Sequence, residues 1–202
     1  MENLNYDDYM AGGFIDVEEP RYEIIEGVKM FISPSPNFGH GSIVSNLVTI
    51  FNNYFWNHKS AGRVIGDNID VHLPDGNLFM PDLTVVCDLN IIKMNDTIYG
   101  VPDLVVEILS RSTMNKDLGA KKLIYERNGV KEYWIVNQWI KSVEVYHLID
   151  GKFNLDNVYQ ICPQQELERM TEEERSDIKT EIKVSIFEDL IVDLDKVFMW
   201  IE

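Results

Sequence analysis

The chain has 202 residues, 45% of them hydrophobic, and its 18 basic and 34 acidic side chains give a formal net charge of −16. This length and apolar content suffice for one full-sized domain with a real core, which excludes wholesale disorder. The two cysteines, Cys87 and Cys162, lie far apart and form no CxxC pair, which excludes a disulfide framework and a zinc ribbon.

Residues 1–10 lack the basic and apolar regions typical of a signal peptide, and no uninterrupted apolar run approaches 18 residues. We therefore expect a cytoplasmic protein with no membrane partner. At face value the charge argues against a partner held through phosphate contacts. The acidity belongs mainly to the two ends, however, since residues 1–20 sum to −6 and residues 151–202 to −7. Residues 111–131 form a local basic stretch of +4.

The predicted elements begin with a β-hairpin over 22–33 that turns at Gly27, after an acidic, loosely structured lead-in. Apolar residues recur at helical spacing over about 40–55 and predict an amphipathic helix. A second hairpin follows over 69–87, with its turn at Pro74-Asp75-Gly76-Asn77.

The second half of the chain predicts a strand over 103–109, a helix over about 114–128 and further strands over 132–136, 143–149 and 153–159. Residues 163–181 favour a short helix or an insertion, and residues 186–200 a closing strand or helix. This order predicts an α/β or α+β fold, a mixed sheet flanked by helices.

A charged residue interrupts the apolar strand at 103–109. Strand alternation places Glu107 on one face with Val105 and Leu109. A carboxylate there must be paired, bind a metal or take up a proton, because burying a bare charge is costly. A strand-end glutamate that reaches solvent, or a structural ion pair, is the alternative interpretation.

The next helix carries a second unusual residue. Lys121 falls near the centre of the apolar stripe that Met114, Leu118, Ile124 and Tyr125 define. An ammonium on a core-facing stripe needs an anionic partner, and Glu107 is the nearest candidate in the sequence. Alternatively, Lys121 extends along the apolar surface with its ammonium in water.

A divalent cation prefers several oxygen ligands, so a further carboxylate is needed. Asp75, Asp82 and Asp103 each follow a proline. Turn chemistry explains Asp75, and Asp103 is roughly 13 Å along the strand from Glu107. Asp82 remains. Carboxylates holding Mg²⁺ beside a lysine are the arrangement that phosphodiester hydrolysis requires.

The succession of motifs over roughly residues 20–160 resembles the Uma-type "putative restriction endonuclease" family of the PD-(D/E)XK nuclease superfamily. The motifs are Tyr22-Glu-Ile-Ile-Glu-Gly, Ser33-Pro-Ser-Pro followed by His40, Pro81-Asp82, Pro102-Asp-Leu-Val-Val-Glu-Ile-Leu-Ser, Ser112-Thr with Asp117 and Lys121, and Gly129-Val-Lys-Glu-Tyr-Trp-Ile-Val.

The resemblance implies a restriction-endonuclease-like mixed sheet flanked by helices, in which Asp82, Glu107 and the backbone carbonyl of Ile108 bind Mg²⁺ or Mn²⁺. The usual lysine two residues after the glutamate is absent, because Leu109 stands there. The resemblance instead suggests a lysine moved to the next helix, which Lys121 matches. A homodimer is also expected, since cutting two strands favours two sites.

With this resemblance, the chain divides into an acidic lead-in at 1–20, a nuclease-like domain at 21–160 and an acidic extension at 161–202 that packs on the same domain. Glu23 and His40 are second-shell candidates, with an exposed glutamate and a core or helix-end histidine as the alternatives. Trp134 and Trp139 favour core and strand packing.

We therefore predict a Mg²⁺-dependent endonuclease that hydrolyses DNA phosphodiester bonds, with weak, salt-sensitive DNA affinity. Asp82 and Glu107 hold the metal, and Lys121 assists the attacking water. A second hypothesis is a catalytically inactive nuclease fold that serves as a binding or assembly module. A third is an acidic mimic of nucleic acid that occupies a basic partner.

Overall fold

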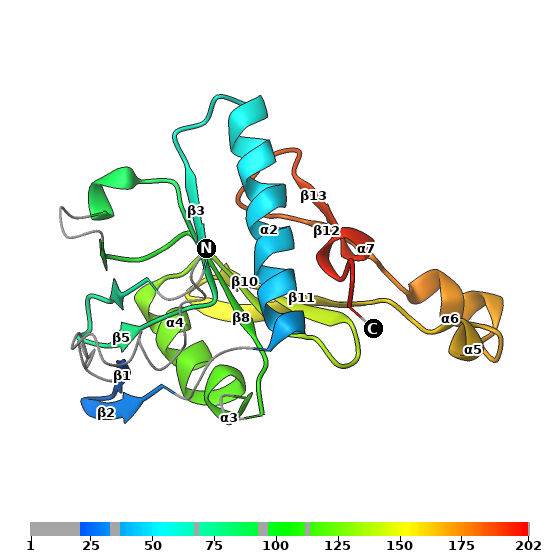
Figure 1. The fold of residues 1–202 in the computed structure, drawn as a ribbon, viewed down its shortest axis with the longest axis horizontal. Coiled ribbons are helices and arrows are strands. Elements are labelled where there is room, and N and C mark those ends of the chain that lie inside the picture. Colours follow the sequence, from blue (N-terminus) through cyan, green and yellow to red (C-terminus); the bar gives the residue numbers. More distant parts are fainter. Residues whose placement is uncertain (1–20, 33–36, 67–68, 93–96, 112–113, 202) are drawn as a thin grey trace, which may run out of the picture.

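The computed structural model describes residues 21–32, 37–66, 69–92, 97–111 and 114–201, and Figure 1 labels its main elements. The predicted lead-in at 1–20 lies outside the described residues. The described strands form two principal sheets and a small β-pair, with helices packed against them. The predicted mixed architecture with an N-terminal hairpin is confirmed, but its strands divide between two sheets instead of forming one.

The larger sheet has six strands in the order β11-β10-β9-β8-β6-β3. Its strands are β3 (Arg63–Gly66), β6 (Leu83–Val86), β8 (Leu104–Ile108), β9 (Glu132–Asn137), β10 (Ser142–Ile149) and β11 (Lys152–Gln160). Only β8 and β9 pair in parallel within it. A parallel pair needs a crossover connection, and the helical segment between β8 and β9 supplies it.

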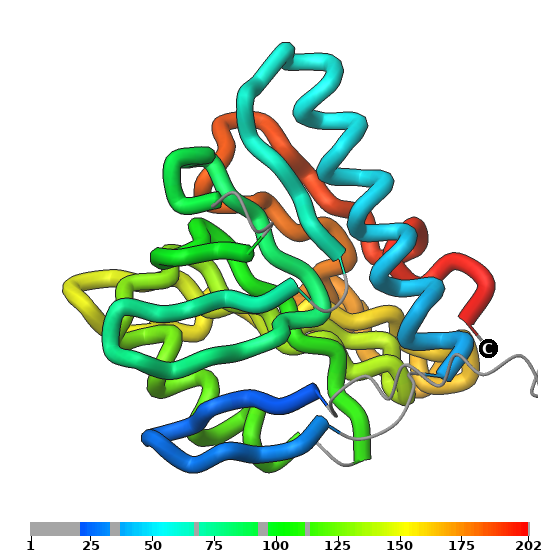
Figure 2. Tube along the Cα trace, turned by 60° about the vertical axis from the view of Figure 1, so that its left-hand side comes forward, coloured from blue at the N-terminus to red at the C-terminus, as the bar shows by residue number. Residues whose placement is uncertain are grey.

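The smaller sheet has five strands in the order β2-β1-β5-β4-β7. Its strands are β1 (Tyr22–Ile25), β2 (Val28–Phe31), β4 (Val71–His72), β5 (Leu78–Phe79) and β7 (Ile98–Tyr99). Glu26 and Gly27 at the first hairpin both have positive φ, as tight hairpin turns require. Figures 1 and 2 show this hairpin beside the helical segment that follows β8.

The prediction of one continuous strand over 78–87 is wrong. The chain leaves the small sheet after β5, passes Pro81 and enters the large sheet as β6. Proline has no N–H to donate to a ladder, so it marks the point where one strand ends. Asp82 lies directly after this break. The strands β3 and β7 and a short 3₁₀ turn (η1, Leu89–Ile91) were not predicted.

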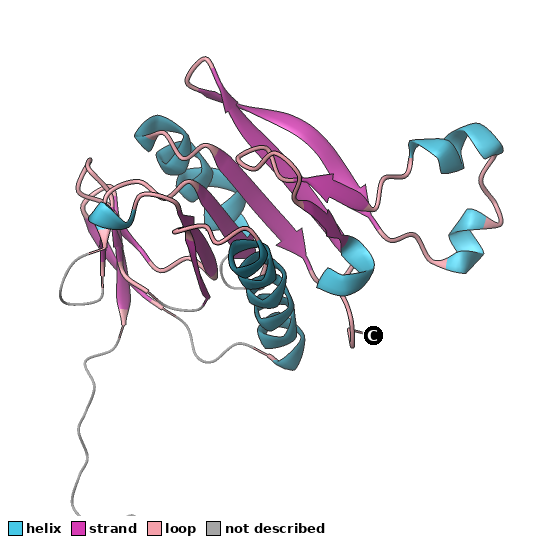
Figure 3. Cartoon of the chain, turned by 90° about the horizontal axis from the view of Figure 1, so that it is seen from above, coloured by secondary structure: helices cyan, strands magenta, loops and turns pink. Residues whose placement is uncertain are grey.

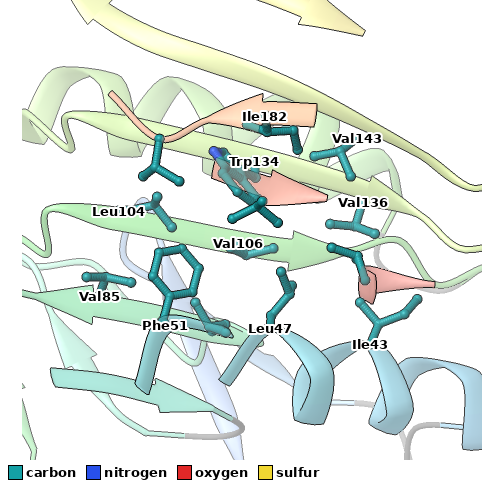
Figure 4. Packing of buried hydrophobic residues seen from close by; sticks show 14 of the residues in the cluster. Ile43, Leu47, Phe51, Val85, Leu104, Val106, Trp134, Val136, Val143 and Ile182 are labelled. Atoms are coloured by element: carbon teal, nitrogen blue, oxygen red, sulfur yellow. The ribbon is translucent and has the colours of Figure 1, made fainter. Parts of the chain in front are cut away.

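Helix α2 (Phe38–Asn57) covers one face of the large sheet and extends two residues beyond the prediction at each end. The side chain of Asn37 caps it by accepting a hydrogen bond from the backbone N–H of His40 at 2.8 Å. Its apolar face packs on Leu104, Val106 and Trp134 among others, as Figure 4 shows. Complete burial of such side chains contributes about 1.5–3 kcal/mol each.

The opposite face of the large sheet meets α3 (Met114–Lys116), η2 (Asp117–Lys121) and α4 (Lys122–Asn128). The segment η2 is a π-helical turn, which places one extra residue in the helix. Ile124 and Tyr125 pack here with Val105 of β8 and with Phe79 of the small sheet. This second core therefore lies between the two sheets, and Glu107 belongs to the same face of β8 as Val105.

The region after β11 contains α5 (Gln164–Leu167) and α6 (Glu172–Asp177), which protrude from the rest of the molecule in Figures 1 and 3. The chain then returns as β12 (Glu181–Lys183), β13 (Ile191–Asp193) and α7 (Leu194–Val197). Ile182 and Val197 are fully buried in the hydrophobic core between α2 and the large sheet. The Asn46 side chain of α2 donates to the Val197 carbonyl at 3.1 Å.

No helix in the described part of the chain combines the length and the apolar character that crossing a bilayer requires.

Candidate active site

Asp82 and Glu107 lie opposite one another where β6 begins and β8 ends. The last antiparallel partners in this direction are Leu83 and Val106. One step further along the same register brings Asp82 opposite Glu107, and opposed residues of an antiparallel pair share a face. The backbone N–H of Ile108 donates to Asp82 Oδ2 at 2.6 Å, which fixes the carboxylate beside the end of β8.

Lys121 reaches Glu107 from the helical segment on the same face. Its Nζ donates to Glu107 Oε1 at 3.1 Å, and only 3% of the lysine is exposed. The prediction that the two side chains converge thus matches their positions, and Lys121 does not extend to water. Leu118, expected on the same apolar stripe, is instead 43% exposed, and it lies in the π-helical turn, which departs from the regular spacing of an α-helix.

Glu23 of the N-terminal hairpin is the nearest carboxylate to this lysine. Its Oε1 lies 2.8 Å from Lys121 Nζ and also accepts a hydrogen bond from the Met80 N–H at 3.3 Å. Only 4% of Glu23 is exposed, so the interpretation as an ordinary exposed glutamate is wrong. Strand alternation predicts which face Glu23 occupies, but it does not show that the helical segment covers that face.

Two further side chains complete this network, and sequence reasoning missed both. Asp117, almost fully buried, places Oδ1 3.5 Å from Lys121 Nζ. Tyr125 is fully buried and donates its hydroxyl to Glu107 Oε1 at 2.9 Å. The i,i+4 spacing from Asp117 to Lys121 was a usable signal. Tyr125 is one of the residues that define the apolar stripe, and that pattern does not predict a hydrogen bond from its hydroxyl group.

His40 lies on the other side of Asp82. Its Nε2 is 3.1 Å from Asp82 Oδ1, and the residue is 8% exposed in the first turn of α2. Asp82 therefore accepts contacts on both oxygens, from the imidazole and from the Ile108 amide. His40 is both a helix-end histidine and a direct neighbour of the Asp82 carboxylate.

Burial and the neighbouring charges together shift the pKa values of this cluster. Burial raises the pKa of Glu107 well above its usual range; Lys121 opposes this, and the nearby carboxylates Asp117, Asp82 and Glu23 reinforce it. Burial alone would lower the pKa of Lys121, but Glu107, Glu23 and Asp117 outweigh it and raise that pKa. Lys121 is therefore a permanent cation here.

The donor set fits a hard divalent cation in its chemistry. Asp82 and Glu107 supply carboxylate oxygens from adjacent strands, and the Asp82 side chain is 21% exposed and open to solvent. Mg²⁺ commonly uses one or two carboxylates and completes its shell with water and phosphate oxygens. Within the described ranges no three His, Cys, Asp or Glu side chains are arranged to hold a metal among themselves.

The two other aspartates that follow prolines lie elsewhere. Asp103 accepts from Lys131 Nζ at 2.6 Å and from the Cys87 N–H at 2.7 Å, beyond the start of β8. Asp75 accepts from the Asn77 N–H within its turn at 3.2 Å. Both have structural partners that explain them.

Comparison with known proteins assigns the chain to a family. Residues 7–180 match the model of the Uma2 family, described as "Putative restriction endonuclease". The chain belongs to this family. The matched span contains Asp82, Glu107 and Lys121.

Two other proteins are similar to this Uma2-family chain. A protein of Synechocystis, described as uncharacterized, is 30% identical over 154 residues, which cover 74% of this chain and 78% of the relative. A crystal structure from Anabaena variabilis, titled a "putative nuclease belonging to DUF820", superposes with a TM-score of 0.61. It shares 18% identity and covers 99% of this chain and 100% of its own, which shows a common fold.

Proposed function

We propose that this Uma2-family chain is a Mg²⁺-dependent endonuclease that hydrolyses phosphodiester bonds in DNA. The observation that carries the proposal is the meeting of Asp82 and Glu107 at one end of the sheet, with Lys121 bonded to Glu107 from the following helix. The description of the family supports the same activity.

Asp82, Glu107 and the backbone carbonyl of Ile108 would hold Mg²⁺ or Mn²⁺. When bound, the metal polarises the phosphate and lowers the pKa of a coordinated water. The network around Lys121 suits this role. Three acidic side chains, Glu23, Glu107 and Asp117, face one ammonium. Burial, and then repulsion from the neighbouring carboxylates, raises the pKa of Glu107, and a bound cation would offset both effects.

The side chains around these ligands orient them. His40 and the Ile108 amide fix the two oxygens of Asp82, while Tyr125 and Lys121 both fix Oε1 of Glu107. Lys121 stays protonated because of its carboxylate neighbours. A fixed cation beside the scissile phosphate stabilises the negative charge that develops there and positions the attacking water.

The charge of the chain bears on substrate affinity. With a net charge of −16, binding through phosphate contacts is weak and falls steeply with salt. Two copies of the chain would bring two sites to a duplex, so we also propose a homodimer during double-strand cleavage.

The test is cleavage of supercoiled plasmid and labelled oligonucleotides with Mg²⁺ or Mn²⁺, for wild type beside Asp82→Ala, Glu107→Ala and Lys121→Ala. Asp103→Ala is the matched control, because Asp103 lies beyond the opposite end of β8. We expect the first three variants to lose cleavage and the control to retain it. Cleavage that survives Asp82→Ala would overturn the site.

A non-catalytic binding module is the second candidate. It is favoured by the ion pair and hydrogen bond that occupy Glu107 Oε1, which oppose binding of a metal. Calorimetric titration with Mn²⁺ separates the two functions. Binding that disappears in Glu107→Gln supports the nuclease, and absence of binding to the wild type supports the module.

A further inference from the structure

A group of exposed apolar side chains lies at the end of the large sheet where β8 terminates. We call it the aromatic rim. Its members are Phe38 (78% exposed), Trp139 (46%), Ile140 (55%), Met199 (46%) and Trp200 (80%). Trp139 is therefore not a core residue, and that prediction is wrong: it lies in the turn between β9 and β10, outside the ladder.

Packing contacts hold the segments of the rim together. Lys141 Nζ, in the β9–β10 turn, donates to the carbonyl of Ile201 at 2.6 Å. Gly39, next to Phe38, is so close to both segments that an added Cβ would lie 3.0 Å from Gln138 Oε1 and 3.8 Å from Ile201 Cδ1. Figures 1 and 2 show the start of α2 near the C-terminal end of the chain.

The aromatic rim borders the candidate active site. Gln138, the residue before Trp139, donates its side-chain N–H to the carbonyl of Leu109 at 3.1 Å, just past the end of β8. Phe38 precedes by two residues the histidine that contacts Asp82. A strand lying across the rim would therefore lead its backbone toward Asp82 and Glu107.

The charge around the rim differs from that of the chain. Residues 37–41, 109–111, 137–141 and 198–201 contain no aspartate or glutamate, although the chain has 34 of them. The same segments carry the cations Arg111 and Lys141. These four segments therefore add no acidic side chain of their own that would repel a phosphate backbone.

We infer that the aromatic rim binds single-stranded DNA by stacking unpaired bases, and that it selects strands with unpaired bases for the adjacent site. The inference rests on the proposed function. Every base offers a π-face to tryptophan or phenylalanine only when it is unpaired and splayed, so stacking favours single strands over duplexes. Stacking adds affinity without adding phosphate contacts, which suits a protein with a net charge of −16.

A second copy of the chain is a less suitable occupant. In a twofold dimer the same patch meets itself, which would bring like charges such as Arg111 and Lys141 of both copies together. The segments that form the rim contain two cations and no acidic side chain, and a phosphate backbone complements that charge.

The test measures fluorescence anisotropy of a labelled 15-nucleotide thymidine strand and of a matched hairpin duplex in low salt with EDTA. The protein is full-length Asp82→Ala, alone and combined with Trp139→Ala and Trp200→Ala. The matched control is Trp56→Ala. Trp56 is 71% exposed near the opposite end of α2, so its loss removes the same kind of surface away from the rim.

We expect the single strand to bind about tenfold or more tightly than the duplex, and the two rim substitutions to remove about tenfold or more of that affinity. Trp56→Ala should change neither value. Equal binding of both oligonucleotides, or equal losses in the rim and control variants, overturns the inference. Sedimentation of the same variants shows whether the rim substitutions abolish only self-association; that outcome assigns the rim to a second copy and also overturns the inference.

Cleavage separates this inference from the proposed function. If the wild type does not cut DNA but binds single strands through the rim, the proposed nuclease function is refuted and the rim inference stands. If the wild type cuts, and the rim substitutions leave its ratio of single-strand to duplex cleavage unchanged, the rim inference fails while the nuclease stands.

Discussion

The ammonium of Lys121 lies closer to the carboxylate of Glu23, at 2.8 Å, than to that of Glu107, at 3.1 Å. Glu23 belongs to the N-terminal hairpin of the small sheet and Glu107 to the large sheet. One buried cation therefore bridges two sheets that share no strand.

Removing the cation should cost far more than removing one of its partners. Lys121→Met leaves the buried carboxylates of Glu23, Glu107 and Asp117 with no cation among them, and we expect a loss of about 3–5 kcal/mol in unfolding free energy. Glu23→Gln leaves two carboxylates to neutralise the lysine and keeps the side-chain shape, so about 1 kcal/mol is expected. Urea denaturation measures both. Equal losses would show that the lysine is not the centre of the network.

The hydroxyl of Tyr125 should contribute to stability through Glu107. Tyr125→Phe removes the 2.9 Å hydrogen bond to Glu107 Oε1 in a fully buried position, and we expect a loss of about 1–2 kcal/mol. Tyr159→Phe is the control, because that hydroxyl bonds the half-exposed Asp156 and its loss is compensated by water. Thermal and urea unfolding of both variants test this difference, and a larger effect at Tyr159 contradicts it.

Stability at low pH should depend on Asp75. Burial raises its pKa, but hydrogen bonds from Asn77, Asn128 and Arg127 outweigh burial and lower the pKa from 3.8 to about 2. A group whose pKa is lowered on folding stabilises above its unfolded pKa, and this stability is lost as the pH falls.

We therefore expect Asp75→Asn to destabilise the protein by about 1–2 kcal/mol at pH 6, allowing for partial exposure. The difference from wild type should shrink as the pH falls from about 4 toward 2. Urea denaturation at pH 6, 4 and 2.5 follows it. A difference that stays constant over this range would assign the effect to lost packing instead of ionisation.

Two glycines of the helical segment should respond in opposite directions to alanine. Gly129 ends α4 with φ of 89°, where a side chain is strained, so Gly129→Ala should cost about 1–2 kcal/mol. Gly119 lies within η2, and an added Cβ there meets no heavy atom within 4 Å. Gly119→Ala should therefore be neutral or stabilise by up to about 1 kcal/mol. Melting temperatures of the two variants are compared with wild type, and loss of stability at Gly119 would show that the π-helical turn needs its glycine.

Local sequence patterns predicted the elements with strong periodicity or strong turn residues. The helix at 40–55, the hairpin around Gly27 and the end of α4 at Gly129 agree with the structure because each depends on neighbours in sequence. The division at Pro81 was missed because apolar content continues across it. Strand pairing is a long-range property, so periodicity alone did not show that two sheets share this segment.

In the candidate site, too, local patterns predicted some residues and missed those that depend on long-range packing. Glu107 and Lys121 were identified from the sequence because each is a charged residue among apolar neighbours. Glu107 interrupts an apolar strand, and helical spacing places Lys121 on an apolar stripe. Glu23 and Tyr125 do not differ from what their sequence neighbours predict, and they join the network through tertiary packing. Asp117 did have a local signal, its i,i+4 spacing from Lys121.

The bridge through Lys121 also constrains how the molecule comes apart. The hairpin of β1 and β2 cannot separate from the rest without breaking the ion pair between Glu23 and Lys121 and exposing the buried ammonium to water. The small sheet and the end of β8 therefore open as one cooperative unit. Shortening the chain from its N-terminus through the hairpin would remove the support of the candidate active site itself, and the remainder would not be a smaller version of the same protein.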